Sequence, residues 1–207
     1  MFSVLFLHGQ NTDSLRVVSF EKNHPDLNYQ NLVQKYNKLS QPADSVEFEY
    51  LYYVKYRNQA FSYFDLTSDE KFFREKYNSG KYRESAELGM KLIQKDPTDL
   101  KTLLYTAISF IHINEPDSAA ELRKRFNLLL SIISKYGDGK TAETSFRVVK
   151  ISDEYAILEN TKDMFYNRKT KQQPDCIIDS WDIFSAPTRK NYQLHFKFNT
   201  LYTMLEK

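Results

Sequence analysis

Apolar residues recur at three- and four-residue spacing along the first two thirds of the chain, and this spacing predicts amphipathic helices. In the first of them, over residues 28–39, the apolar positions are Tyr29, Leu32, Val33, Tyr36 and Leu39. A second helix begins at Asp44 or Ser45, whose side chains can accept hydrogen bonds from the free amides of a helix N-terminus. The first part of the chain is therefore predicted to be helical.

Thr67 begins a third predicted helix, because Glu70 three residues later completes a capping box. Apolar spacing carries this helix to Asn78. Two further helices are predicted over 99–114 and 116–135, and together they form a degenerate copy of the helix pair that precedes them.

Residues 79–99 resemble one tetratricopeptide-type repeat, which is a pair of packed helices. Gly80 takes the place of the turn between the helices, Ser85 is small where they would approach, and Pro97 follows the second helix. Gly89 departs from the pattern, since a large aromatic side chain is expected there. Two such pairs are too few for a free-standing solenoid, so we expect them to stack on the rest of the chain.

Helical periodicity stops at Tyr136, and strand-like runs begin soon afterwards. Gly137 fits the left-handed residue that follows a helix, and Asp138-Gly139 fits a tight turn. Runs rich in β-branched and aromatic residues predict strands at 145–151, 154–160, 175–184 and 192–198. The polar segment between the second and third runs is interpreted as a long surface loop.

Short connections between the four strands favour an antiparallel meander. The sequence thus predicts an α+β fold, in which an N-terminal helical region with tetratricopeptide-like helix pairs precedes a four-stranded antiparallel β-sheet. The predicted segments are an irregular lead-in or signal remnant over 1–27, the helical region over 28–136, and the sheet region over 137–207. The helical and sheet regions are expected to share one core.

Charge is balanced along the chain, with 29 basic and 27 acidic residues and a formal net charge of +2. This balance gives no electrostatic footprint for nucleic acid, so no nucleic-acid partner is expected. The single cysteine, Cys176, excludes an internal disulfide and a cysteine-based zinc site. The histidines have no metal-ligand spacing, so neither a metal nor another cofactor is expected; they are His8, His24, His112 and His195.

The N-terminal run MFSVLFLHGQ is apolar but lacks the basic start and the length of a secretory signal. It is interpreted either as the remainder of such a signal or as a buried segment. No other apolar run approaches the roughly 20 residues that span a bilayer, so no integral membrane segment is expected.

Candidate chemistry is sparse. The segment GDGKT lacks the glycine that a phosphate-binding loop places at the position of Ser134, and it precedes a strand rather than a helix. A rival interpretation is an enzyme site at the Gly-Asp-Gly end of the sheet, formed by carboxylates beside a histidine or thiol. Its candidate residues are Asp138, Asp153, Glu154, Cys176 and His195.

Aromatic residues cluster after the second predicted helix begins, and they allow two interpretations. They can pack between helices, or they can form a surface that stacks on a peptide or sugar. The candidate binding residues of this cluster are Tyr50, Tyr53, Tyr56, Phe61 and Tyr63.

Three strings, EFEYLYYVKY, GKYRESAELGMKLIQKDP and GDGKTAETSFRVVKISDEYAIL, resemble an uncharacterised domain-of-unknown-function family of exported proteins from Gram-negative bacteria. The resemblance covers roughly residues 25–200. It implies a periplasmic or secreted protein, the alternative being a cytoplasmic one. It implies no activity, so it assigns no catalytic role to any residue.

The sequence as a whole favours a non-catalytic module of the cell envelope that binds a protein or peptide partner. This hypothesis depends on the helix pairs, since stacked pairs form concave surfaces. The alternative is a hydrolase-type enzyme with its site at the Gly-Asp-Gly end of the sheet.

Overall fold

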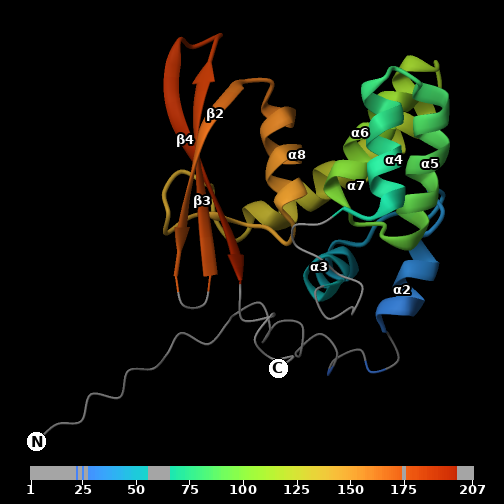
Figure 1. Cartoon of the computed structure of the whole chain (residues 1–207). Helices are drawn as coiled ribbons and strands as arrows, with labels where there is room; N and C mark the ends of the chain where they lie inside the picture. Colours follow the sequence, from blue (N-terminus) through green and yellow to red (C-terminus); the bar gives the residue numbers. More distant parts are fainter. Residues whose placement is uncertain (1–21, 23–24, 26–27, 56–65, 174–175, 200–207) are drawn as a thin grey trace, which may run out of the picture.

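The computed structural model describes residues 22, 25, 28–55, 66–173 and 176–199, and this part of the chain holds seven helices and a four-stranded sheet (Figure 1). The helices are α2 (Tyr29–Tyr36), α3 (Ser45–Val54), α4 (Ser68–Asn78), α5 (Tyr82–Lys95), α6 (Leu100–His112), α7 (Pro116–Ser134) and α8 (Ile151–Thr161). The strands are β1 (Phe146–Arg147), β2 (Met164–Gln172), β3 (Cys176–Ser185) and β4 (Lys190–Asn199). Helix α8 lies between the sheet and the helices α4–α7.

The helix starts follow the local signals in the sequence. Asp44 caps α3 by accepting the amides of Val46 and Glu47. Thr67 and Glu70 form the predicted capping box of α4. Helix α7 begins with proline, whose missing N–H costs nothing at a first helical position. These predicted starts are confirmed.

Gly89 brings three helices close together. A Cβ at this position of α5 would lie 2.0 Å from Thr106 Oγ1 of α6 and 3.0 Å from the Phe73 ring of α4. The space that an aromatic side chain at 89 would need is therefore filled by a ring from the preceding helix. Nearby, Ser109 of α6 donates a hydrogen bond to Ser85 of α5 at 3.0 Å, so small residues do meet at this contact.

We expect Gly89→Ala to lower the free energy of unfolding by about 1–2 kcal/mol, because overpacking outweighs the better helix propensity of alanine. Thr106→Ala removes the nearest atom, and Thr106 Oγ1 has no hydrogen-bond partner among the described residues. The double variant should therefore recover part of the loss, with a coupling of about 1 kcal/mol in urea unfolding. Strictly additive effects would contradict this account of the contact.

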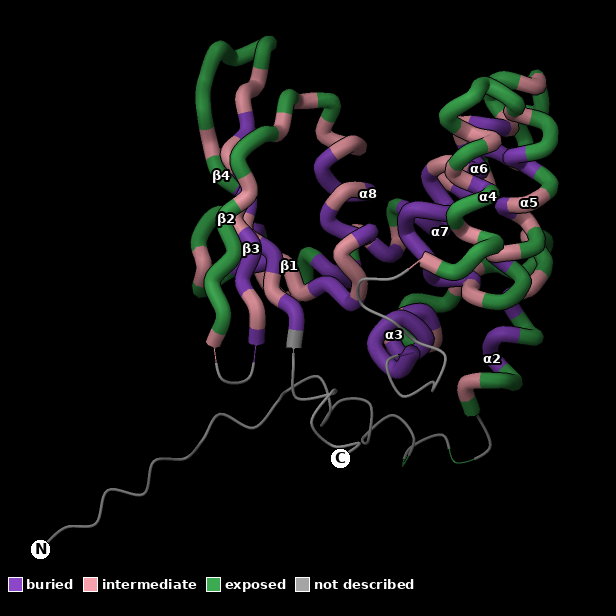
Figure 2. Tube along the Cα trace, in the orientation of Figure 1, coloured by how far each residue is buried: buried purple, intermediate pink, exposed green. Residues whose placement is uncertain are grey.

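The sheet has the strand order β1-β4-β3-β2. Strand β3 runs antiparallel to both β2 and β4, whereas β1 pairs parallel with β4, so that Phe146 lies opposite Phe196. The strict alternation predicted for β4 is confirmed, since Leu194, Phe196 and Phe198 are buried whereas the residues between them are more exposed. Leu194 lies opposite Trp181 of β3, whose indole bonds to Glu154, so this face is directed towards α8. Figure 2 shows how burial varies along the sheet and the helices. The prediction of a wholly antiparallel sheet was wrong, because the sheet is mixed.

Two other predicted elements were wrong. Residues 154–160 belong to helix α8 instead of a strand, and residues 164–172 form strand β2 instead of a loop. Helix α8 is enclosed by the sheet and the other helices, and six of its first eight residues are buried: Ser152, Asp153, Glu154, Ala156, Ile157 and Leu158. Burial around the whole helix removes the one-sided pattern by which helices are recognised. Strand β2 is largely exposed, so only its ladder with β3 defines it.

The connection from α7 to β1 differs from its predicted form. Helix α7 ends at Ser134, and the left-handed glycine is Gly139, with a φ of 71°, whereas Gly137 is not in the left-handed region. A Cβ on Gly137 would lie 2.2 Å from the carbonyl oxygen of Thr144. Glycine is required at 137 by this close approach of two backbone segments, and the predicted reason, a positive φ, was wrong.

One cluster of buried side chains extends through both the helices and the sheet. It includes Leu103 of α6, Ile157 of α8 and Trp181 of β3. A buried hydrogen bond of 2.8 Å from Tyr52 of α3 to Asp153 of α8 also joins the two regions. Helix α8 is thus packed on both of its sides.

Candidate functional site

The predicted aromatic surface lies partly in the core. Tyr50 and Tyr53 are only 5% and 7% exposed. Tyr53 donates a hydrogen bond to the carbonyl oxygen of Arg147, and its ring packs edge-on against Tyr136. These two tyrosines therefore pack between elements, which is the first of the two interpretations offered by the sequence. The other three candidates, Tyr56, Phe61 and Tyr63, lie outside the described residues.

The backbone N–H of His195 donates to the carbonyl oxygen of Gly139, so the Gly-Asp-Gly turn does lie beside β4, but the side chains of the candidate enzyme residues are bonded to different partners. Asp138 is exposed, and its carboxylate accepts hydrogen bonds from Thr144 and pairs with Lys140 at 2.9 Å, so the pKa of Asp138 is lowered by these donors. Asp153 and Glu154 are buried on α8, where Asp153 accepts a hydrogen bond from the Tyr52 hydroxyl and Glu154 accepts one from the Trp181 indole.

Cys176 and His195 are also separate. The Cys176 thiol donates to the Gln173 side chain, while His195 Nδ1 lies 2.8 Å from Ser180 Oγ on the neighbouring strand. Ser180 sits in the middle of β3, where backbone amides are taken up by the ladders with β2 and β4. This serine and histidine pair therefore lacks the free amides that would stabilise an oxyanion.

A buried polar cluster lies between α8 and the sheet. Glu154 accepts a 2.9 Å hydrogen bond from the indole N–H of Trp181, and Asp179 accepts hydrogen bonds from Arg168 and Thr170. Burial, followed by the nearby carboxyl of Asp179, raises the pKa of Glu154 to about 9. At neutral pH the cluster therefore holds a protonated Glu154 beside an ion pair, which keeps its net charge near zero.

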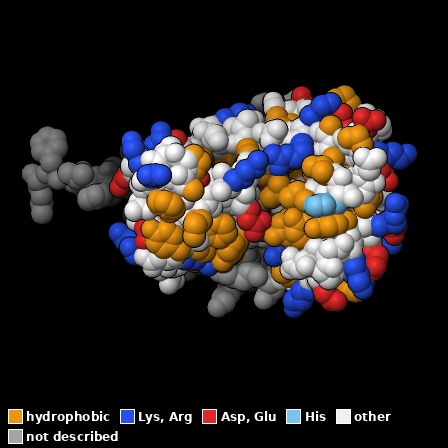
Figure 3. Space-filling model, turned by 90° about the horizontal axis from the view of Figure 1, so that it is seen from above, with side chains coloured by type: hydrophobic (Ala, Val, Ile, Leu, Met, Phe, Trp, Pro, Cys, Tyr) orange, Lys and Arg blue, Asp and Glu red, His pale blue; other side chains and the backbone are white. Residues whose placement is uncertain are grey.

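The best candidate for a binding site is a groove between α6 and α8, with a volume of about 630 Å³. We call this site the α6–α8 groove. It is lined by Tyr77, Leu104, Tyr105, Ile108, Ile111, Arg123, Glu159, Asn160 and Lys162. Helix α6 forms the floor, and the last turn of α8 forms one wall. Seen from above, hydrophobic side chains gather here in a hollow of the surface, with basic side chains along a rim (Figure 3).

Stacked rings form the wall opposite α8. Tyr77 of α4 stacks on Tyr105 of α6, with the ring centroids 3.9 Å apart and an interplanar angle of 10°. Outside the lining, Tyr82 of α5 stacks on His112 of α6 at 3.9 Å and 5° and packs edge-on against Tyr77, so it supports the wall from behind. Burial raises the pKa of both Tyr77 and Tyr105, so these phenols stay neutral. The wall is held in place by three helices.

The charged side chains of the groove are mostly basic. Glu159 forms an ion pair with Lys101, and its carboxylate also accepts a hydrogen bond from the Tyr105 hydroxyl. The negative charge of Glu159 is therefore balanced by Lys101. Arg123 donates a 3.0 Å hydrogen bond to the neutral amide of Asn160. Lys162 is exposed at the end of α8, and neither cation has a carboxylate within ion-pair distance among the described residues.

Lys162 ends α8 in the left-handed conformation, with a φ of 62°. Because a β-carbon disfavours this conformation, Lys162→Gly should raise the free energy of unfolding by about 1 kcal/mol. The same substitution at Lys124, which is exposed within helix α7, should lower it by about 1 kcal/mol. Urea unfolding of both variants checks this, and an equal loss in both would contradict it.

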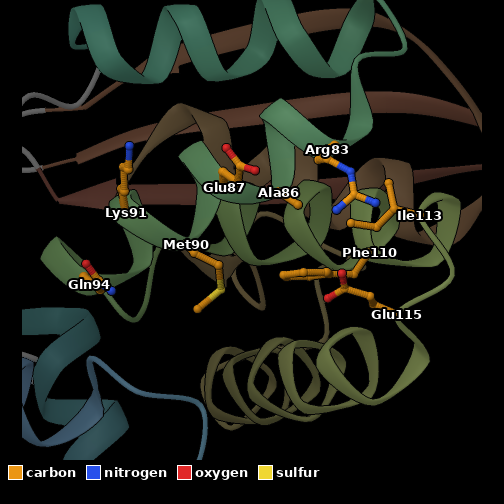
Figure 4. Close-up of a pocket in the computed structure, with 9 residues that line it drawn as sticks. All are labelled: Arg83, Ala86, Glu87, Met90, Lys91, Gln94, Phe110, Ile113 and Glu115. Carbon is orange, nitrogen blue, oxygen red and sulfur yellow. The ribbon is translucent and has the colours of Figure 1, made fainter.

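A second depression, of about 430 Å³, is lined by α5, the end of α6 and the segment between α6 and α7. Met90 and Phe110 point towards α7, whereas Glu87 and Lys91 point away from it (Figure 4). Its lining carries two basic and two acidic residues, so it has no charge preference. The larger and asymmetrically charged α6–α8 groove is the stronger candidate.

None of the groove residues was identified from the sequence. The available signal was the stripe of Leu104, Ile108 and Ile111 on α6, which has helical spacing but resembles an ordinary core face. Ile111 is nevertheless 60% exposed. Its exposure depends on which elements pack against α6, which the local pattern does not specify.

Within the described residues, no three histidine, cysteine, aspartate or glutamate side chains form a group that could hold a metal ion. Among the same residues, none of the helices combines the length and the hydrophobicity needed to cross a membrane.

Comparison with known proteins identifies one family. Residues 19–194 match the family described as Domain of unknown function (DUF4919), which covers most of the chain. Neither the curated proteins nor the solved structures contain a match. The resemblance to a family without an established function is thus confirmed, and the chain belongs to the DUF4919 family.

Proposed function

We propose that this protein is a non-catalytic binding protein that holds a peptide segment of another protein in the α6–α8 groove. The observation that carries the proposal is Ile111, which is 60% exposed at the end of an apolar floor whose other residues are buried or half-buried, beside the stacked rings of Tyr77 and Tyr105. Covering exposed apolar surface of this kind with another chain removes it from water and so favours binding.

The shape of the site favours a peptide. The groove is open to solvent in Figure 3, whereas small-molecule sites usually enclose most of their ligand. Helices α4 to α7 form two successive pairs, and the proposal adds that these pairs present a surface in the manner of tetratricopeptide repeats. Rings held by stacking lose little conformational entropy when they bind.

The proposal includes a place of action outside the cytoplasm. Its support is the resemblance to exported proteins of Gram-negative bacteria together with the apolar run at residues 2–7. Fractionation of a Gram-negative host that expresses the full chain tests this part. Recovery with the periplasmic or secreted fraction is expected, and recovery with the cytoplasm alone would overturn it.

Selection from a random peptide library displayed on phage tests the binding function, with the full chain as bait. The key variant is Ile111→Glu, which places a charge on the groove floor. The matched control is Val46→Glu on α3, because Val46 is 52% exposed and lies on another helix. Both variants replace one exposed aliphatic residue on a helix surface.

Peptides selected by the unmodified chain should bind Val46→Glu equally well and Ile111→Glu at least about tenfold more weakly, a loss of about 1.4 kcal/mol. Urea unfolding should show that both variants remain folded. If no peptide is selected, or if the selected peptides bind Ile111→Glu as tightly as the unmodified chain, the proposed function is wrong.

A further inference from the structure

We infer that the α6–α8 groove selects peptides that carry a carboxylate next to their apolar side chains, and that Arg123 and Lys162 receive this carboxylate. The inference rests on the proposed function and specifies its partner. It follows from the charges that surround the groove.

Two cations, Arg123 and Lys162, line the groove beside one carboxylate, Glu159. Arg74 of α4 lies close enough to Tyr105 to affect the pKa of its phenol. Among the described residues that line the groove, Glu159 is the one acidic side chain, and its ion-pair partner Lys101 lies just outside the lining. Since Glu159 is paired with Lys101, the remaining cations attract an anionic partner.

Arg123 is prepared to bind a carboxylate. One of its terminal nitrogens donates to Asn160, and its guanidinium lies over the Phe126 ring at 5.0 Å. These contacts fix the side chain while leaving further N–H groups for a planar acceptor. Arginine in this state can donate two parallel hydrogen bonds to one carboxylate.

One effect opposes the inference. Helix α8 ends at this side of the groove, and the C-terminus of a helix carries about half a negative charge. Arg123 and Lys162 carry two full positive charges at the same end of the groove. The cations therefore outweigh the helix end, and the local field favours an anion.

The phage selection described above distinguishes this inference from the proposed function. The same random library is selected against the unmodified chain and against the double variant Arg123→Gln with Lys162→Gly. The control bait is Lys124→Gln, because Lys124 is adjacent to Arg123 but 71% exposed and paired with Glu121. Because Arg123→Gln alters the hydrogen bond to Asn160 of α8, urea unfolding of the double variant is measured beside the selection, and a midpoint no lower than that of the unmodified chain shows that a loss of binding does not reflect unfolding.

Aspartate or glutamate should be enriched among the peptides selected by the unmodified chain and by Lys124→Gln, and not among those selected by the double variant. Replacing the acidic residue of a selected peptide by its amide should weaken binding about tenfold, with a smaller effect at high salt.

If the selected peptides depend on Ile111 but show no acidic enrichment, or if their amide forms bind equally well, the inference is wrong while the proposed function stands. If no peptide depends on Ile111, the proposed function fails and the inference fails with it. A peptide that prefers the double variant would also overturn the inference.

Discussion

Replacing Gly137 with alanine is expected to lower the free energy of unfolding by about 3 kcal/mol. The added Cβ would lie 2.2 Å from the carbonyl oxygen of Thr144 and 2.7 Å from that of Ser145. Both atoms belong to the backbone, which cannot turn aside as a flexible side chain can. The segment that leads into β1 would have to move, and with it the hydrogen bond from Gly139 to Thr144.

Gly80→Ala is the matched control for this prediction. Gly80 has a φ of 72°, but a Cβ there would meet no atom within 4 Å. It should cost only about 1 kcal/mol, the typical strain of a left-handed residue. Urea unfolding midpoints measure both variants. A larger loss for Gly80→Ala than for Gly137→Ala would show that positive φ, and not close contact, limits these glycines.

Stability is expected to fall as the pH rises from about 6 to about 8, because of Glu154. The unfolded chain releases this proton near the ordinary pKa of a glutamate, whereas the folded chain keeps it until a pH of about 9. The stabilisation that the protonated Glu154 provides is therefore complete below the pKa of Glu154 in the unfolded chain, and it is lost as the pH rises towards the pKa of Glu154 in the folded chain. The expected slope is on the order of 1 kcal/mol per pH unit.

Glu154→Gln should remove this pH dependence. A glutamine can accept the Trp181 indole hydrogen bond through its amide oxygen, as Glu154 does, and it has no proton to release in this pH range. The variant should match or exceed the stability of the unmodified chain near pH 8, with a flat profile in urea unfolding between about pH 6 and 8. Asp153, with a pKa raised to about 6 by burial, acts mainly below this window.

Glu154→Leu provides the contrast, since it leaves the buried Trp181 N–H without its acceptor and should be less stable than the glutamine variant at every pH. An unchanged slope in Glu154→Gln would show that another group causes the pH dependence. A flat profile in the unmodified chain would show that Glu154 is ionised in the folded state.

Some features of the fold depend only on residues close together in the chain, and these could be predicted. The starts of α3 and α4 follow from Asp44 and Thr67, whose side chains bond to amides two or three residues away. The inward face of β4 follows from strict alternation, because one side of that strand is buried throughout.

Gly137 shows the limit of such local reasoning. The sequence identified a position that requires glycine, but it suggested the wrong cause. The contact partner, Thr144, lies in a loop whose path depends on the pairing of Gly139 with His195 of β4. A rule based on neighbouring residues can thus predict that a position is glycine without identifying the distant contact that makes glycine necessary.

Other features were decided by tertiary structure alone. Helix α8 is buried on both sides, so its apolar pattern carries no helical stripe, and the polar strand β2 exists through its pairing with β3. The parallel pairing of β1 with β4 joins residues that are far apart in the chain, since Phe146 lies opposite Phe196. The α6–α8 groove combines side chains of α4, α6, α7 and α8, which only the packing of these helices brings together. Sequence patterns report what each segment does to its near neighbours, whereas a groove is defined by the spaces that distant segments leave between them.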